Sequence, residues 1–267
     1  LGAAVISAIF IARRSVYKTN SRRAALASRS TTMRAVAPLS TAAARRVWRR
    51  AAAVCFDVDS TVCQEEGIDV LADICGAGDA VAELTRNAMG GSMPFHDALE
   101  ARLALMTPSL AQVNEACDAV SLSPRVDALV AALTERGTAV FLVSGGFRQM
   151  INPIAARLGI PESRVYANNI LFDEAGDYAG FDANEMTARA GGKARVVAQL
   201  KATHGLSPIV MVGDGATDME ARDGTAEGAD AFVGFGGVVV REEVEKGADW
   251  FVMDHAALID ELDVVES

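Results

Sequence analysis

Two aspartates separated by one residue, Asp57 and Asp59, directly follow the apolar run 51–56. Such a run predicts a buried strand, and the carboxyl ends of parallel strands form the usual ligand site of an open α/β sheet. Both carboxylates are therefore expected to project into a site. Alone, the pair is equally compatible with a solvated turn, so its meaning depends on what other segments supply.

Two glycine-rich segments supply groups that bind anions. The apolar run 139–143 ends in a Ser-Gly-Gly sequence at 144–146, whose hydroxyl and backbone amides can bind phosphate oxygens. A Gly-Gly pair precedes Lys193 at the start of the helical stretch 194–201, where the helix dipole does not favour a cation. A site that needs positive charge would explain this lysine, although a surface lysine is the commoner interpretation of the pattern alone.

A second pair of acids follows the apolar run 208–212. Asp214 and Asp218 lie four residues apart in a glycine-containing turn. Carboxylate oxygens of this kind suit Mg²⁺, which keeps several waters and takes one or two protein carboxylates. The four segments together indicate phosphoryl chemistry more strongly than any of them does separately.

Apolar runs alternate with helical stretches from residue 51 onward, as in the βαβ units of a parallel sheet. The stretch 66–137 is longer than a crossover helix requires and predicts a helical cap inserted after the first strand. We expect an α/β fold, a Rossmann-like doubly wound parallel sheet, whose core comprises 51–65 and 138–267. The expected strands are 52–58, 138–143, 163–167, 208–213, 229–233 and 249–253, with a hairpin at 168–182.

The first fifty residues contain ten Arg, one Lys and no acid. This composition is typical of a transit peptide, so we expect residues 1–50 to be disordered and to direct the chain to the plastid, or alternatively to the mitochondrion. A basic arm that docks on RNA or membrane is the other interpretation. The apolar stretch 1–12, at the start of a sequence that lacks an initial Met, also leaves room for a truncated signal segment.

The remainder of the chain is acidic, because a net charge of −10 overall leaves −21 after the +11 of residues 1–50. Such a body argues against nucleic acid or a membrane as partner and favours a small-molecule substrate held by local cations. The four cysteines form no CxxC pair and predict reduced thiols. A monomer or a homodimer is expected.

The four segments resemble motifs one to four of the haloacid dehalogenase superfamily of phosphohydrolases, over residues 53–255. Further segments resemble the phosphoserine phosphatase family within it: FDVDSTV at 56–62, EEGID at 65–69, AMGG at 88–91, RLAL at 102–105, SGGFR at 144–148, GGK at 191–193, GDGATDME at 213–220 and AFVGFGG at 231–237. Cys63 and the polar link 222–228 depart from the family pattern, away from the expected catalytic positions.

The resemblance implies hydrolysis of O-phospho-L-serine through an aspartyl-phosphate, the last step of the phosphorylated route to L-serine. Asp57 would be the nucleophile and Asp59 the general acid and base. Mg²⁺ would be held by Asp57, the Asp59 carbonyl and Asp214, while Asp218 would orient a metal water or Lys193.

The resemblance also implies the substrate contacts. Glu66 would face the substrate ammonium and Arg102 its carboxylate, although spacing alone favours surface residues on helices. The remaining contacts implied are Ser144, Gly145 and Lys193 on the phosphoryl group, Thr217 as a further substrate contact, and Met89, Gly90 and Phe95 in a segment that closes over the substrate.

Two other functions stay open from the sequence. An aspartyl-phosphate can pass its phosphoryl group to an alcohol such as homoserine, which would make the protein a phosphotransferase. A noncatalytic phospho-aspartate switch or binding module also places an acceptor aspartate and a metal at strand ends. Asp59 favours an enzyme, because an acid/base beside the phosphoryl group hastens hydrolysis.

Overall fold

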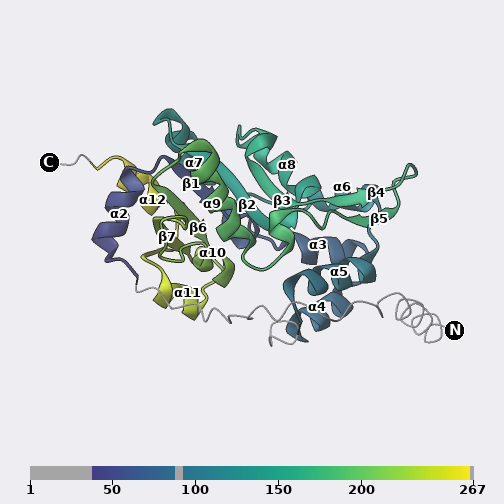
Figure 1. The fold of residues 1–267 in the computed structure, drawn as a ribbon. Coiled ribbons are helices and arrows are strands. Elements are labelled where there is room, and N and C mark those ends of the chain that lie inside the picture. Colours follow the sequence, from purple (N-terminus) through teal and green to yellow (C-terminus); the bar gives the residue numbers. More distant parts are fainter. Residues whose placement is uncertain (1–37, 88–92, 265–267) are drawn as a thin grey trace. The chain divides into compact units, whose positions relative to one another are not determined.

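The computed structural model describes residues 38–87 and 93–264 (Figure 1). A six-stranded sheet with the order β3-β2-β1-β6-β7-β8 lies at its centre, and all neighbouring strands are parallel. This confirms the predicted α/β, Rossmann-like sheet. Its strands are β1 (Ala53–Phe56), β2 (Ala139–Phe147), β3 (Val165–Asn168), β6 (Ile209–Gly213), β7 (Ala231–Phe235) and β8 (Trp250–Val252).

Both faces of the sheet are covered by helices, as the near-continuous apolar strands require. Val54 and Phe56 of β1 join one buried cluster, and the alternate residues Ala53 and Cys55 join another. The first cluster includes α2 (Thr41–Arg49), α7 (Val126–Glu135), α8 (Arg148–Arg157) and α12 (His255–Leu262). The second lies beneath α9 (Gly192–His204), α10 (Ala216–Glu220) and α11 (Glu242–Gly247).

The strand order brings the two acidic segments together. The central strands β1 and β6 are neighbours, and their register sets Phe56 beside Val212. The next backbone amide, that of Asp57, still donates to the Val212 carbonyl at 2.9 Å. The turns after these two strands therefore leave the sheet at the same level, on the same edge.

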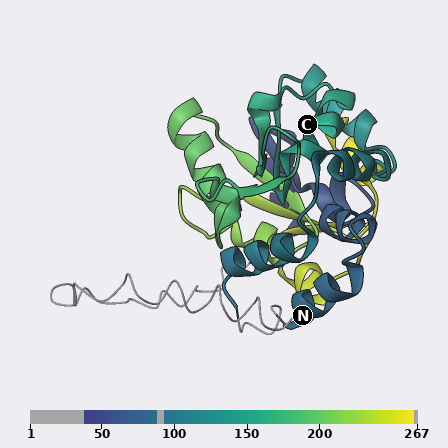
Figure 2. The ribbon, with the colours of Figure 1, turned by 90° about the vertical axis from the view of Figure 1, so that its right-hand side faces the viewer.

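Helices α3 (Gly67–Ile74), α4 (Gly78–Asn87) and α5 (Phe95–Met106) pack on one another beside this edge (Figures 1 and 2). Helix α6 (Leu110–Asp118) contacts α3 and α8, whereas α7 packs on β2 and α12. Helix α7 is therefore part of the helical layer of the sheet. The hairpin is present as the antiparallel strands β4 (Ile170–Phe172) and β5 (Tyr178–Phe181).

The expectation that residues 1–50 are disordered is wrong for residues 41–49, which form helix α2. Helix α2 buries Trp48, whose indole Nε1 donates to the Leu258 carbonyl at 3.0 Å and whose ring meets Trp250 edge-on. Arg49 pairs with Glu261 of α12. The Arg-rich composition hid an amphipathic helix, because Arg45 and Arg46 lie on its exposed face and its buried face is short.

The four cysteines are unpaired, and Cys55 and Cys63 are buried. Burial raises the pKa of the Cys55 thiol to about 12, so it stays protonated. None of the helices in residues 38–87 and 93–264 is long and apolar enough to cross a membrane.

Candidate active site

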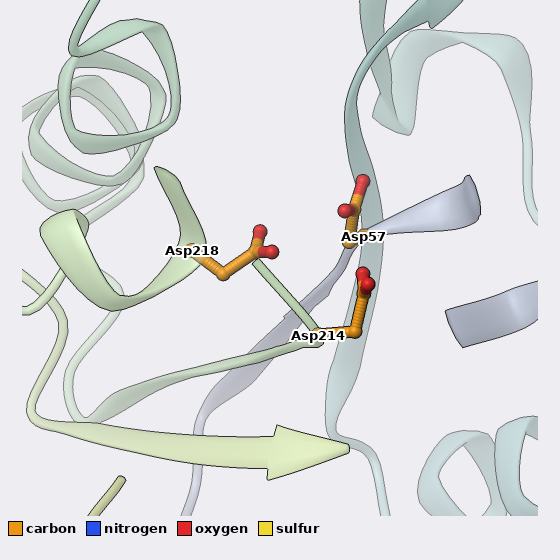
Figure 3. Close-up of side chains that lie close together, drawn as sticks. All are labelled: Asp57, Asp214 and Asp218. Atoms are coloured by element: carbon orange, nitrogen blue, oxygen red, sulfur yellow. The ribbon is translucent and has the colours of Figure 1, made fainter. Parts of the chain in front are cut away.

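Three carboxylates meet at the edge of the sheet (Figure 3). Asp57 follows β1, Asp214 follows β6 and Asp218 lies in α10, and their oxygens lie within 4.8 Å of one another. Asp218 approaches so closely that a Cβ on Gly213 would lie 2.2 Å from its Cγ. The glycine that ends β6 is therefore needed to admit the third acid.

A buried ammonium group joins two of these acids. Lys193 Nζ lies 2.8 Å from Asp57 Oδ1 and 2.7 Å from Asp218 Oδ1. Burial lowers the pKa of Lys193, but the two carboxylates outweigh this effect and raise it overall, so the side chain stays charged. The lysine at the helix start, which the dipole disfavours, is stabilised by these acids.

Asp59 is held at the start of α3. Its Oδ1 accepts a hydrogen bond from the Gly67 amide at 2.8 Å. Burial and the negative charges of Asp57 and Glu66 raise the pKa of Asp59 to about 7. This carboxyl group therefore holds a proton up to near-neutral pH, whereas ordinary aspartates lose theirs several pH units lower.

The Ser-Gly-Gly segment occupies an irregularity in β2. The register of β2 with β3 shifts between Val143 and Phe147, which lifts residues 144–146 out of the regular ladder. The Gly146 amide donates to Ser144 Oγ at 2.9 Å, and a Cβ on Gly146 would lie 3.2 Å from Asp59 Oδ2. The bulge thus places Gly146 close to the carboxyl group of Asp59.

The carboxylates fit a divalent metal ion. The contacts of Asp57 with Lys193 and with the Val58 amide both use Oδ1, which leaves Oδ2 for another ligand. Asp214 lies beside it, 3% exposed, with the Thr61 hydroxyl 3.5 Å away. Clustered hard oxygen donors of this kind suit a divalent cation, which would also relieve the repulsion between the acids.

A cavity of about 230 Å³ opens over these groups. Nine of the predicted residues line it: Asp57, Asp59, Glu66, Phe95, Arg102, Gly145, Lys193, Asp214 and Thr217. Ser144 and Asp218 do not, because both are completely buried beneath its wall. Met89 and Gly90 lie outside the described residues.

The wall opposite the sheet comes from α3 and α5. Glu66, at the start of α3, accepts from the Ser60 hydroxyl at 2.8 Å, and burial raises its pKa. The Nε of Arg102 donates to the Ala98 carbonyl of its own helix at 3.2 Å. Burial lowers the pKa of Arg102, and nearby Asp69 opposes this effect. One cavity therefore has an acid and an arginine facing the carboxylate cluster.

Sequence reasoning missed Arg241. It precedes α11, and its guanidinium donates to Asp214 Oδ2 from Nε at 2.9 Å and from Nη2 at 2.8 Å, while Nη2 lies 3.4 Å from Glu66 Oε1. The signal that could have found it is its position in the segment after β7, since β7 is the neighbour of β6 and its carboxyl end meets the same edge. Thr187 and Arg189, which also line the cavity, were missed as well.

Known proteins resemble this chain in sequence and in fold. The family model of haloacid dehalogenase-like hydrolases matches residues 51–222. The chain is 52% identical over 219 residues to the chloroplastic phosphoserine phosphatase of Arabidopsis thaliana, a match covering 81% of this chain and 74% of that protein. The chain belongs to the phosphoserine phosphatase family of haloacid dehalogenase-like hydrolases.

A second relative agrees with this membership, and a solved structure shows the same fold. The phosphoserine phosphatase of Homo sapiens is 50% identical over 221 residues, which cover 82% of this chain and 96% of that one. A substrate-bound phosphoserine phosphatase complex superimposes with a TM-score of 0.67 at 23% identity, over 79% of this chain and 97% of the other, and shows the fold. The family resemblance predicted from the sequence is therefore confirmed, and the chain is a hydrolase.

Proposed function

We propose that this protein hydrolyses O-phospho-L-serine to L-serine and phosphate with Mg²⁺, through an aspartyl-phosphate on Asp57. The observation that carries the proposal is the ammonium of Lys193 between Asp57 and Asp218, in a cavity whose far wall holds Glu66 and Arg102. Relatives at about half identity bear the name of this activity. The reaction is the last step of the phosphorylated route to L-serine.

The first step transfers the phosphoryl group to the enzyme. A carboxylate oxygen of Asp57 attacks phosphorus, and the bond between phosphorus and the serine oxygen breaks. Asp59 gives its proton to the departing serine oxygen, so L-serine leaves neutral at that atom. Its position against Gly67 and Gly146 holds the carboxyl group beside the nucleophile.

The second step restores the enzyme. Asp59, now a carboxylate, accepts a proton from a water molecule whose oxygen attacks the phosphorus of phospho-Asp57. The bond between phosphorus and the Asp57 oxygen breaks, phosphate leaves, and Asp59 again carries a proton. Lys193 binds phosphoryl oxygens in both steps, with the Gly145 amide and Thr217 as further donors.

Asp57, the backbone carbonyl of Asp59 and Asp214 are the groups that would hold Mg²⁺, with Asp218 orienting Lys193. The ion, when bound, neutralises charge on phosphoryl oxygens that would otherwise repel the Asp57 carboxylate. The hard, all-oxygen donor set favours Mg²⁺ over softer divalent cations such as Zn²⁺.

Substrate choice comes from the wall formed by α3 and α5. Arg102 receives the substrate carboxylate, for which a planar guanidinium is suited, and Glu66 receives the ammonium group. Phe95, at the start of α5, contacts the phosphate-binding segment, since a Cβ on Gly145 would lie 3.4 Å from its ring. Met89 and Gly90 complete the cap segment in this proposal, and residues 66–137 contain the cap.

The chain acts in the plastid in this proposal, with the mitochondrion as the alternative. A relative named chloroplastic and the basic, acid-free residues 1–37 support it. Helix α2 is retained in the mature enzyme, because it packs on the core. The working form is a monomer or a homodimer.

The test is phosphate release from O-phospho-L-serine by the purified protein with Mg²⁺, beside phosphoethanolamine, glycerol 3-phosphate and a nitrophenyl phosphate. We expect turnover of phosphoserine well above the others, no turnover by Asp57→Asn, and full turnover by Asp260→Asn, which changes an exposed acid on α12. Comparable turnover of all four esters overturns the substrate assignment. Phosphohomoserine as main product with added homoserine, or labelled enzyme without turnover, overturns the hydrolase mechanism.

A further inference from the structure

Arg189 differs from the other three cations that line the cavity, which are Arg102, Lys193 and Arg241. Lys193 and Arg241 each pair with two of the acids of the site, and Asp69 attracts the guanidinium of Arg102. Arg189 forms no ion pair with any acid in the described part of the chain. Its charge is therefore available to an anion that arrives from solution.

The segment that carries Arg189 forms one side of the cavity mouth. Thr187 and residues 189–193 all line the cavity. Thr187 and Lys193 are buried, whereas Arg189 and Ala190 are exposed. A residue that lines a cavity and is also exposed lies where the cavity meets the solvent. Arg189 is therefore at the mouth, four residues before the ammonium group proposed to bind the phosphoryl group.

Hydrogen bonds to the interior fix the first end of this segment. The Thr187 hydroxyl donates to Oδ1 of Asn168, the last residue of β3, at 2.9 Å. The Asn168 Nδ2 in turn donates to the Gly145 carbonyl at 2.7 Å. Both side chains are buried, so these bonds are shielded from water. The segment is thereby attached to the phosphate-binding turn of β2.

Arg195 of α9 fixes the other end of the segment through backbone carbonyls. Its Nη1 donates to the Ala190 carbonyl at 2.8 Å. Its Nη2 donates to the Met186 carbonyl at 2.7 Å and to the Arg189 carbonyl at 3.2 Å. Gly191 then turns the chain into α9 with a φ of +71°, which glycine adopts readily. Because the backbone is held on both sides, only the Arg189 side chain has to be ordered when it binds an anion.

The charge of the protein makes such a cation useful. Residues 51–267 carry a net charge of −21, because residues 1–50 contribute +11 to a total of −10. A phosphate monoester is also negative, with a second pKa of about 6. Salt screens charges that lie farther away than about 8 Å at physiological ionic strength, so the groups at the mouth decide what an approaching phosphate meets. A guanidinium is suited to this contact, because its planar donors can bind two phosphate oxygens.

We propose that Arg189 binds the phosphoryl group of the arriving substrate at the cavity mouth, before that group reaches Lys193, a role that rests on the proposed function. Arg189 does not act on the reacting atoms. Its loss should therefore lower kcat/KM through weaker association and leave kcat unchanged. Since the contact is exposed to solvent, added salt should remove its contribution.

The experiment measures kcat and kcat/KM for phosphoserine and phosphoethanolamine with Mg²⁺, at ionic strengths from about 0.01 M to about 1 M. Calorimetry measures the affinity for inorganic phosphate at the same ionic strengths. Arg189→Gln removes the charge and Arg189→Lys keeps it. Arg86→Gln is the matched control, because it removes the same charge from an exposed arginine on α4 that does not line the cavity.

At low ionic strength we expect Arg189→Gln to lower kcat/KM about fivefold for both esters, the factor for one ion pair in water, with kcat unchanged. The dissociation constant of inorganic phosphate should rise by the same factor. Arg189→Lys should recover most of the loss, and the loss should disappear at high ionic strength. Arg86→Gln should behave like the wild type throughout.

Four results overturn the role of Arg189. They are an unchanged kcat/KM at low ionic strength, a loss that persists at high ionic strength, an equal loss in Arg86→Gln, and a loss confined to phosphoserine. The last would mean that Arg189 binds the substrate carboxylate, which phosphoethanolamine lacks. A wild-type protein inactive on phosphoserine overturns the proposed function instead, and the phosphate affinities of the variants then still test Arg189.

Discussion

The two walls of the cavity are built in different ways. On the sheet side, Asp57, Asp214 and Lys193 are nearly buried, and each is fixed by strand register or by charged partners. On the side of α3 and α5, Glu66 and Arg102 are only partly buried, and the hydrogen bond of Arg102 stays within its own helix. The chemistry is thus held rigidly by the backbone, whereas the groups proposed to recognise the substrate depend on helix packing.

This contrast predicts that kcat and KM separate between the two walls. Substitutions on the sheet side should lower kcat, because they remove groups that act on the reacting atoms. Substitutions on the helical side should raise KM for substrates that carry an amino-acid group and leave other esters unaffected.

The largest loss among four predicted variants is expected for Lys193→Met. Loss of a charged donor to the phosphoryl oxygens should lower kcat about 100- to 1,000-fold. Thermal unfolding should be recorded too, since Asp57 and Asp218 would lose their cation. Lys201→Met on the same helix, which pairs with Asp230, is the control and should keep full activity. A kcat near the wild-type value would show that Lys193 does not bind the phosphoryl group during the reaction.

Arg102→Met tests the other wall. A hydrogen bond to a charged group contributes about 1.5–3 kcal/mol, which corresponds to roughly a 10- to 150-fold rise in KM for phosphoserine. Hydrolysis of phosphoethanolamine, which lacks the carboxylate, should be unchanged. Arg86→Met, an exposed arginine on α4, serves as control. An equal loss of activity towards phosphoserine and phosphoethanolamine would show that Arg102 stabilises the cap and does not bind the substrate carboxylate.

Arg241 connects the walls, since it pairs with both Asp214 and Glu66. Two of its nitrogens donate to Asp214 Oδ2, an oxygen close to where the cation is proposed to bind. Arg241→Met should therefore lower the Mg²⁺ concentration for half-maximal activity severalfold, because a competing cation is gone. A titration of activity with Mg²⁺ decides it, and an increased requirement would mean that Arg241 supports the metal site.

Trp48→Ala should leave kcat/KM unchanged, because α2 lies away from both walls. Removal of this buried ring should instead cost about 3–5 kcal/mol of unfolding free energy. Arg46→Ala on the exposed side of α2 should have little effect. Chemical denaturation of both variants measures the difference, and equal stabilities would mean that α2 contributes little to the folded core.

The sequence predicted the sheet side well, because apolar runs ending in acids or glycines have a clear physical meaning there. Asp57, Asp214 and Lys193 come together as expected, since the carboxyl ends of parallel strands meet at one edge of the sheet. Arg241 was missed because its contact depends on a long side chain reaching across the edge from a loop without a pattern. Helix α2 was missed because a basic leader and a basic amphipathic helix share one composition.

The buried residues that hold the site in place could not be predicted from the sequence either. Asn168 and Thr187 read as polar residues around a hairpin, and only the bulge in β2 explains why Gly145 needs a side-chain partner. Ser144 was expected to face the phosphate directly, whereas it lies beneath the cavity wall, bonded to the Gly146 amide.

The central claim is that the phosphoryl group is transferred to Asp57 before water attacks it and phosphate is released. The most direct measurement is acid quenching during turnover of phosphoserine, followed by borohydride reduction, which converts an aspartyl-phosphate to homoserine, and peptide mapping by mass spectrometry. We predict homoserine at position 57 only, and none in samples without substrate. Rapid phosphate release with an unmodified Asp57, or homoserine at another acid, would contradict the account.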